Sequence, residues 1–165
     1  MAREYSVKSM REIGWENKRH QVESQEYSLD EIENKILRPI KDPRIHFAIN
    51  CASTSCPSLR TTAYSANNIN SELDESVKNA LRSPMHIQLK KDFWGNQYLS
   101  TTKLFQWFKD DFKVEPYESE KGFIHNYAPA EYKRLNINAN LVYNWDLNNE
   151  ENIDKHLKSI SEAKI

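Results

Sequence analysis

The pattern of apolar and polar positions predicts a mixture of helices and short strands. Ser28 and Glu31 have the spacing of a capping box, in which each side chain accepts a hydrogen bond from the other residue's free backbone amide at a helix start. We therefore expect a helix from Ser28 to Arg38, which Pro39 ends because proline lacks an amide hydrogen. A second amphipathic helix, which stops before Pro84, is predicted by apolar residues at helical spacing: Ile69, Leu73, Val77, Ala80 and Leu81.

The segment Arg44–Cys51 has the alternation that is typical of a strand. Its odd-numbered positions are apolar or cysteine, so we expect them to form a buried face with Cys51 in the core. Its even-numbered positions include Arg44, His46 and Asn50, which would share the opposite face. One face of this strand would thus be buried, and the other would carry polar chemistry.

Three further patterns complete the outline. Alternating apolar residues in Met85–Leu89, followed by the turn residues 94–96 and by Tyr98–Leu99, predict a β-hairpin. A helix after the hairpin would be deeply packed, because it carries bulky apolar residues: Leu104, Phe105, Trp107, Phe108 and Phe112. A late strand is expected at 141–143, and a surface helix is expected in the polar tail.

These elements fit one α+β domain, in which helices pack on a small, mostly antiparallel sheet centred on Arg44–Cys51. We divide the chain into a polar N-terminal segment 1–27, a core 28–148 and a C-terminal tail or surface helix 149–165. A length of 165 residues suits one domain. Hydrophobic residues make up 38% of the chain, and six phenylalanines, four tryptophans and eight tyrosines can supply much of the core.

Charge and glycine content exclude several classes of function. The net charge of −1 gives no global field that would recruit nucleic acid. The three glycines leave no phosphate-binding loop, and no pattern indicates a cofactor. No stretch approaches the roughly 18 apolar residues of a membrane span, and the first residues lack the apolar run of an export signal. We expect a small molecule or peptide as partner. The sequence does not identify this partner, the cellular compartment or the oligomeric state.

The candidate chemistry centres on Cys56. This residue lies in a loop rich in serine and threonine before Pro57, where backbone amides can support a thiolate and the loop can fold back over His46. In this hypothesis His46 deprotonates Cys56, and Asn50 orients the imidazole or donates to an oxyanion. The reaction class would be thiol-dependent acyl transfer or amide hydrolysis.

Two charged residues are assigned to binding in the same hypothesis. Arg44 would hold a carboxylate of the ligand or brace Glu33. Glu33 would pair with Arg44 or Arg38 and so fix the polar face of the strand. The alternative for Glu33 is a solvated helix start, because its acidic neighbours Asp30 and Glu31 are favoured there by the helix dipole.

The competing interpretation is a noncatalytic binding or protein-interaction module. In that case Ser55–Pro57 would be a rigid turn, and His46 would bond only to a neighbouring carbonyl. A hydrogen bond between Cys56 and His46 would favour the enzyme, whereas a buried Cys56 or a Cys51–Cys56 bridge would favour the module. A zinc site made of these three side chains is disfavoured, because strand alternation would send His46 and Cys51 to opposite faces.

Several segments resemble the signature of domain-of-unknown-function family 547. The resemblance rests on Tyr27–Asn34, Asp42–Ser53, Ser55–Pro57, Leu99–Ser100, Trp107, Asp111–Phe112 and Tyr143–Asn148. Members of the family occur in bacterial proteins, often with export signals, and as a C-terminal domain in plant proteins. The family has no established activity, so the resemblance implies a fold and candidate positions and does not imply a reaction.

The chain departs from the family pattern in two places. Members usually begin with a helical region that contains a Trp-Ile-Asn-x-Tyr-Asn motif, which residues 1–27 lack. On this ground we expect a fragment or a gene model that starts late. Near the other end, Asn144 stands where the family usually has aspartate, and Asp146 stands where it usually has serine.

Overall fold

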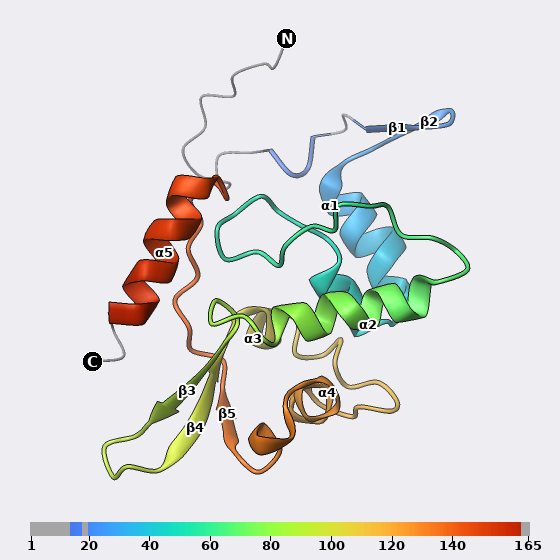
Figure 1. Ribbon diagram of the computed structural model, residues 1–165. Helices are drawn as coiled ribbons and strands as arrows, with labels where there is room; N and C mark the ends of the chain where they lie inside the picture. The colour runs from blue at the N-terminus through green and yellow to red at the C-terminus, as the bar shows by residue number, and fades with distance from the viewer. Residues whose placement is uncertain (1–13, 18–19, 163–165) are drawn as a thin grey trace.

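The computed structural model describes residues 14–17 and 20–162 (Figure 1). Residues 1–13, which begin the polar N-terminal segment, lie outside the described residues, as do 18–19 and 163–165. The described elements are, in chain order, β1 (His20–Val22), β2 (Gln25–Tyr27), α1 (Leu29–Glu31), η2 (Ile32–Leu37), η3 (Arg38–Ile40), η4 (Pro43–Phe47), α2 (Ile69–Ala80), β3 (Ile87–Lys91), β4 (Gln97–Thr101), α3 (Leu104–Trp107), α4 (Glu120–Tyr127), η5 (Ala130–Tyr132), β5 (Asn136–Asn138) and α5 (Glu150–Glu162).

A capping box begins the first helix, as the sequence predicts. Ser28 Oγ accepts a hydrogen bond from the backbone N–H of Glu31 at 3.0 Å, and the Glu31 carboxylate accepts one from the N–H of Ser28 at 3.1 Å. The helical stretch continues from α1 through the π-helical η2 into the 3-10 turn η3, which contains Pro39. Lys41 then takes the left-handed conformation, with a φ of 61°. The predicted helix is therefore confirmed, but Pro39 does not end it, because the helical stretch continues to Ile40 and ends at Lys41.

The segment that was assigned to a strand from its alternation is helical. Asp42 caps η4 by accepting a hydrogen bond from the backbone N–H of Arg44 at 3.0 Å. Pro43 follows the cap, and its fixed φ suits the first helical position. Residues 45–47 are all buried, whereas a strand with one exposed face would bury only every second residue. The strand predicted at Arg44–Cys51 is therefore wrong, and the sheet is not centred there.

The main sheet has three strands in the order β3-β4-β5. β3 and β4 form the predicted antiparallel hairpin, with Ile87 opposite Thr101, and Gly95 in the turn has a φ of 84°. β5 lies parallel to β4, so the late strand is at 136–138 and not at the predicted 141–143. Together with the antiparallel pair β1-β2, this sheet confirms the α+β class with mostly antiparallel pairing.

Four phenylalanines form the centre of the core: Phe47, Phe105, Phe112 and Phe123. Each is at most 1% exposed, and neighbouring ring centroids lie between 4.9 and 6.2 Å apart. The aromatic helix is shorter than predicted, since α3 ends at Trp107. Phe112 lies in the turns that follow α3 and still packs into the core. The prediction of deep packing holds for both Phe105 and Phe112.

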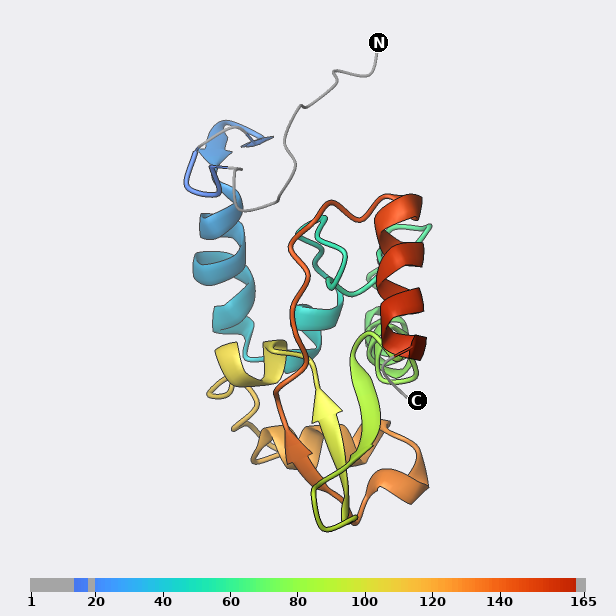
Figure 2. The ribbon, with the colours of Figure 1, turned by 90° about the vertical axis from the view of Figure 1, so that its left-hand side faces the viewer.

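The loop that follows η4 lies between two helical layers. Figures 1 and 2 show the stretch Leu29–Ile40 on one side of this loop and α5 on the other. The loop is joined to the extended segment before α5, since Thr54 N donates to Asp146 O at 2.7 Å and Ser55 N donates to Asn144 O at 3.2 Å. This late segment therefore positions the two cysteines that flank the loop.

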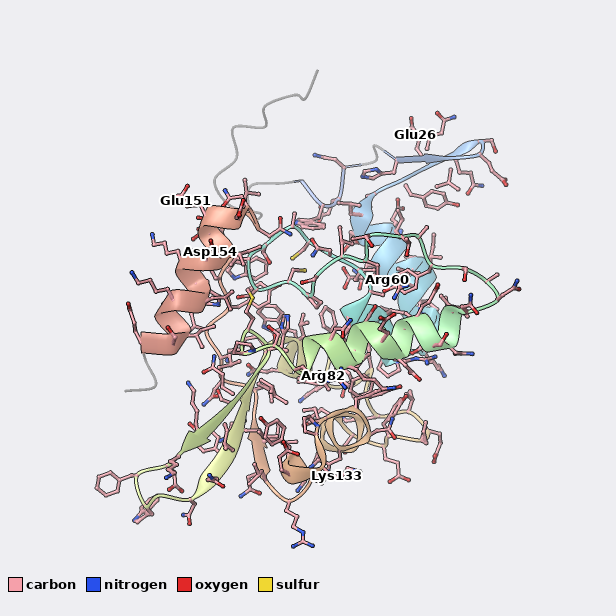
Figure 3. All side chains as sticks on the ribbon, in the orientation of Figure 1. Glu26, Arg60, Arg82, Lys133, Glu151 and Asp154 are labelled. Carbon is pink, nitrogen blue, oxygen red and sulfur yellow. The ribbon has the colours of Figure 1, made fainter. Side chains whose placement is uncertain are left out.

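Charged side chains are spread over the periphery. Figure 3 shows Glu26, Lys133 and Glu151 on different sides of the molecule. Among the described residues, the most exposed aromatic side chains lie in the β3-β4 turn, where Phe93 is 94% exposed and Trp94 is 81% exposed. Among the helices of the described residues, none combines the length and apolar character needed to cross a membrane.

Candidate functional site

A cavity of about 300 Å³ lies between the first helical stretch, η4, the cysteine loop, α3 and the extended segment before α5. Most of its wall is apolar or aromatic, from Trp15, Leu29, Ile32, Leu37, Ile49, Pro57, Leu104, Trp107, Phe108, Tyr143 and Trp145. Its other lining residues are Glu33, His46, Asn50, Cys51 and Cys56. The cavity is thus an apolar pocket with two sulfur atoms and a few polar groups in its wall, as is usual for a ligand site.

Both cysteines are free thiols and are partly buried in this wall. Their Sγ atoms lie 2.9 Å apart, and the backbone N–H of Cys51 donates to Cys56 Sγ, also at 2.9 Å. The loop between them is held by Asn50, whose side-chain amide donates to Pro57 O and whose oxygen accepts from the N–H of Ala52. Ala52 has a φ of 56°, which turns the chain back so that the two sulfur atoms meet.

The two sulfur atoms differ in their surroundings. When both are protonated, the Cys51 thiol donates to Cys56 Sγ; when Cys51 is ionised, the Cys56 thiol can donate to it instead. This hydrogen bond lowers the pKa of Cys51 well below its usual range, and bonds from Ser53 and Tyr143 add to the effect against the opposing effect of burial. The same contact raises the pKa of Cys56, and burial raises it further. These opposite shifts favour a thiolate on Cys51 over one on Cys56.

Two hydroxyl groups complete the surroundings of Cys51. Ser53 Oγ lies 3.0 Å from Cys51 Sγ and donates to the Tyr143 hydroxyl at 3.0 Å, and that hydroxyl lies 3.5 Å from Cys51 Sγ. Burial raises the pKa of Tyr143, as does the negative charge of an ionised cysteine beside it, so its hydroxyl stays protonated and can donate. Tyr143 is 92 residues from Cys51, and spacing within the loop could not reveal this contact.

The His46 side chain forms its hydrogen bond with a carboxylate and not with a cysteine. Its Nε2 lies 2.9 Å from Asp111 Oδ2, and Asp111 also receives two hydrogen bonds from Arg38, at 2.6 and 2.8 Å. The imidazole stacks on Phe108 with a centroid distance of 4.0 Å. Its Nδ1 is buried and has no hydrogen-bond partner among the described residues. Nε2 therefore carries the proton toward Asp111, and Nδ1 keeps a lone pair.

Burial and charge set the ionisation of this group. Burial lowers the pKa of His46, although the hydrogen bond to Asp111 opposes the shift. The hydrogen bond from Arg38 holds the pKa of the Asp111 carboxyl below its usual range. At neutral pH the imidazole is thus neutral and the Asp111 carboxylate is ionised.

The structure separates the two residues predicted to bind ligand. Glu33 lines the cavity, and burial raises the pKa of its carboxyl although Arg38 opposes the shift. Arg44 is not among the lining residues. Its guanidinium bonds to Asp42 at 2.7 Å and Asp74 at 2.9 Å, which ties η4 to α2. Its pKa is raised chiefly by the hydrogen bond to Asp42.

Four of the five predicted site residues are therefore brought to one cavity: Glu33, His46, Asn50 and Cys56. The sequence reasoning did not assign Asp111, Ser53 or Tyr143 to the site, and it placed Cys51 in the core. Asp111 and Tyr143 do fall in segments that carry the family resemblance, which was the available signal. Cys51 was predicted to lie in the core because a strand was expected at Arg44–Cys51. The structure has a helical turn there, so the reason for that prediction no longer holds.

Metal binding has no support from the arrangement of potential ligands. Nowhere in residues 14–17 and 20–162 do three or more histidine, cysteine or acidic side chains come together closely enough to hold an ion. Within the cavity, His46 Nε2 is occupied by Asp111, and the two cysteine sulfur atoms contact each other.

Comparison with protein families identifies a match within the N-terminal half of the chain. Residues 3–79 match the family model described as "Protein of unknown function, DUF547". The resemblance read from the sequence is confirmed over these residues, which include Glu33, His46, both cysteines and Asn50 but not Asp111 or Tyr143. No curated protein and no solved structure matches the chain.

Proposed function

We propose that the cavity is a thiol-dependent active site in which Cys51 attacks a carbonyl carbon, for acyl transfer or amide hydrolysis. One observation carries this proposal: the Cys51 sulfur stands in the wall of an apolar cavity with Cys56, Ser53 and Tyr143 around it. These contacts favour the thiolate, which is the nucleophilic form of cysteine.

The proposed reaction uses Cys56 as the proton carrier. Attack by Cys51 Sγ forms a carbon–sulfur bond and breaks the bond from the carbonyl carbon to a nitrogen or oxygen leaving group. The leaving group takes the proton of the Cys56 thiol, which becomes more acidic once the charge on Cys51 has been used. Water or another acceptor then attacks the thioester, releases Cys51 as a thiolate and returns a proton to Cys56.

The other predicted residues keep places in this scheme with altered roles. Asn50 positions the loop, because both ends of its side chain bond to loop backbone. His46 forms part of the cavity wall, with its ring held by the bond from Nε2 to Asp111 and by stacking on Phe108. Glu33 offers a hydrogen bond from its acid form, which burial favours. Arg44 anchors η4 and does not contact the ligand.

A noncatalytic binding module is the second candidate. It is favoured by the hydrogen bond of His46 to Asp111 in place of Cys56, and by the use of Asn50 within the loop. In this case the cavity binds an apolar ligand, and the contact between the sulfur atoms stabilises the loop.

An activated ester separates the two candidates. Reduced protein would be incubated with p-nitrophenyl acetate, and acylation located by intact mass and peptide mapping. We expect an acetyl group on Cys51 that is lost in Cys51→Ser and retained in Cys56→Ser, where the hydroxyl still donates to Cys51. Absence of acylation, or acylation that Cys51→Ser leaves unchanged, contradicts the enzyme and favours the module.

The pH dependence of alkylation tests the cause of the reactivity. The rate with iodoacetamide should rise through a midpoint below the ordinary thiol value of about 8.5, because hydrogen bonds stabilise the Cys51 thiolate. Cys56→Ala removes the first of these bonds and should raise the midpoint. Cys56→Ser, the matched control, should raise it less. An ordinary midpoint in the native protein contradicts the assignment of the thiolate to Cys51.

A further inference from the structure

We infer that Cys51 and Cys56 are also a dithiol–disulfide couple, which reacts with small disulfides and closes into an internal disulfide at the cavity wall. The observation is the contact of the two Sγ atoms at 2.9 Å, in the wall of a cavity that can admit a small molecule. The inference goes beyond the proposed acyl transfer and does not require it, because exchange needs only the two sulfur atoms and a disulfide.

The backbone already holds the pair in a closed arrangement. The N–H of Cys56 donates to Ser53 O at 3.0 Å, and the side chain of Asn50 bonds to Pro57 O. The outer side of the loop is fixed by Thr54 and Ser55 through their bonds to the segment before α5. Closing a disulfide therefore requires the sulfur atoms to approach from 2.9 Å to the bond length of about 2.05 Å, with little further ordering of the chain.

The surroundings assign different roles to the two sulfur atoms. Exchange proceeds by attack of a thiolate on one sulfur of a disulfide, and Cys51 Sγ is the sulfur that lies within 3.0 Å of the Ser53 hydroxyl and 3.5 Å of the Tyr143 hydroxyl. Cys56 is next to it and can resolve the mixed disulfide that results. Both residues are partly exposed in the cavity wall, so a small disulfide can reach them.

The exchange reaction needs only the two cysteines and one small disulfide as reactants. The Cys51 thiolate attacks a disulfide RSSR, forms a mixed disulfide with one RS group and releases the other as RS⁻. The Cys56 sulfur then attacks Cys51 Sγ and displaces the second RS group, and the proton of Cys56 leaves with it as RSH. The protein is oxidised by two electrons, and the small disulfide is reduced to RS⁻ and RSH.

Oxidation would remove the thiolate from the cavity. In the disulfide form Cys51 cannot attack a carbonyl or react with iodoacetamide, and its hydrogen bonds with Ser53 and Tyr143 lose their charged acceptor. The couple thus makes any thiol chemistry of the cavity depend on the redox state around the protein.

The test uses bis(2-hydroxyethyl) disulfide, which is small and uncharged. Reduced protein would be treated with it at neutral pH, quenched with N-ethylmaleimide and examined by intact mass and peptide mapping. We expect the native chain to lose both thiols and to contain a Cys51–Cys56 bridge that dithiothreitol reverses. Cys56→Ser should stop at a mixed disulfide on Cys51, and Cys51→Ser should react about tenfold more slowly.

Three results would overturn the inference: a native chain that keeps both thiols, a native chain that retains a stable mixed disulfide, or Cys51→Ser protein that reacts as fast as the native chain. The native chain itself separates this inference from the proposed function, because acylation by p-nitrophenyl acetate tests only the acyl transfer and the Cys51–Cys56 bridge tests only the couple. Bridge formation without acylation supports the couple and removes the acyl transfer. Acylation without bridge formation does the reverse.

Discussion

Two aromatic regions of this molecule lie side by side and are built differently. In the phenylalanine core, Phe47, Phe105, Phe112 and Phe123 contact one another and are at most 1% exposed. Around the cavity, the aromatic residues Trp107, Phe108, Tyr143 and Trp145 leave about 300 Å³ open. Protein interiors are normally packed without such voids, so the second region is packed less closely than the first.

The two regions meet at η4. Phe47 packs on Phe105 and Phe123 in the core, while its neighbour His46 lines the cavity and stacks on Phe108. Successive residues of one helical turn can serve both regions, because they point in different directions around its axis. We therefore expect substitutions in the core to change mainly the free energy of unfolding, and substitutions around the cavity to change mainly the reactivity of the cysteines.

The largest effect is expected from Phe123→Ala in the core. Phe123 is fully buried and contacts other aromatic rings on several sides, so its truncation should lower the free energy of unfolding by about 4 kcal/mol. Urea denaturation measures this loss. The iodoacetamide rate of Cys51, measured without urea, should stay within about twofold of the native rate in the folded protein. A large change in that rate would show that the two regions are coupled.

A slightly smaller effect is expected from pH through His86. Burial lowers the pKa of this imidazole to about 4, with a smaller effect from His156, while the unfolded value is about 6.5. Between those values the unfolded chain binds a proton that the folded protein does not. The contribution is therefore fully present above pH 6.5, and about 3 kcal/mol is lost as the pH falls to 4.

His86→Leu checks this assignment. Urea denaturation at several pH values should show a loss of stability between pH 6.5 and 4 that is about 3 kcal/mol smaller in the variant than in the native chain. His46, whose pKa burial also lowers, remains in the variant and continues to titrate in the same direction. Identical pH profiles for the two proteins would contradict the role given to His86.

Asp111→Asn should have an intermediate effect at the border of the cavity. The substitution removes the charge that pairs with Arg38 and accepts from His46, and we expect a loss of about 2 kcal/mol. The adjacent Asp110→Asn is the matched control, because Asp110 pairs with Lys113 on the exposed surface, where solvent screens the pair, and its loss should be much smaller. Equal losses in thermal or urea unfolding would show that the bonds of Asp111 to Arg38 and His46 add no more stability than a surface ion pair.

The smallest effect on stability is expected from Trp107→Ala. Trp107 lines the cavity and packs on Tyr143 and Trp145, yet it is 45% exposed, so the loss should be about 1 kcal/mol. Trp94→Ala in the exposed hairpin turn is the control, with almost no loss expected. Only Trp107→Ala should raise the alkylation rate of Cys51, because it opens the cavity. An unchanged rate would show that Trp107 does not limit access.

Local signals in the sequence predicted several elements correctly. The capping box at Ser28 and the hairpin around Gly95 depend on residues within a few positions of each other, and both are present in the structure. The strand predicted at Arg44–Cys51 failed because alternation was given more weight than the cap formed by Asp42 and the proline after it. Tertiary packing then buried consecutive residues there.

The sequence by itself determined the fold class, the main helices and four residues of the cavity wall. Only the tertiary structure showed that the groups around Cys51 favour its thiolate, and that His46 bonds to Asp111. The reason is physical: ionisation depends on the donors, charges and burial around an atom. For Cys51 and His46 those groups include Tyr143 and Asp111, which are 92 and 65 residues away along the chain.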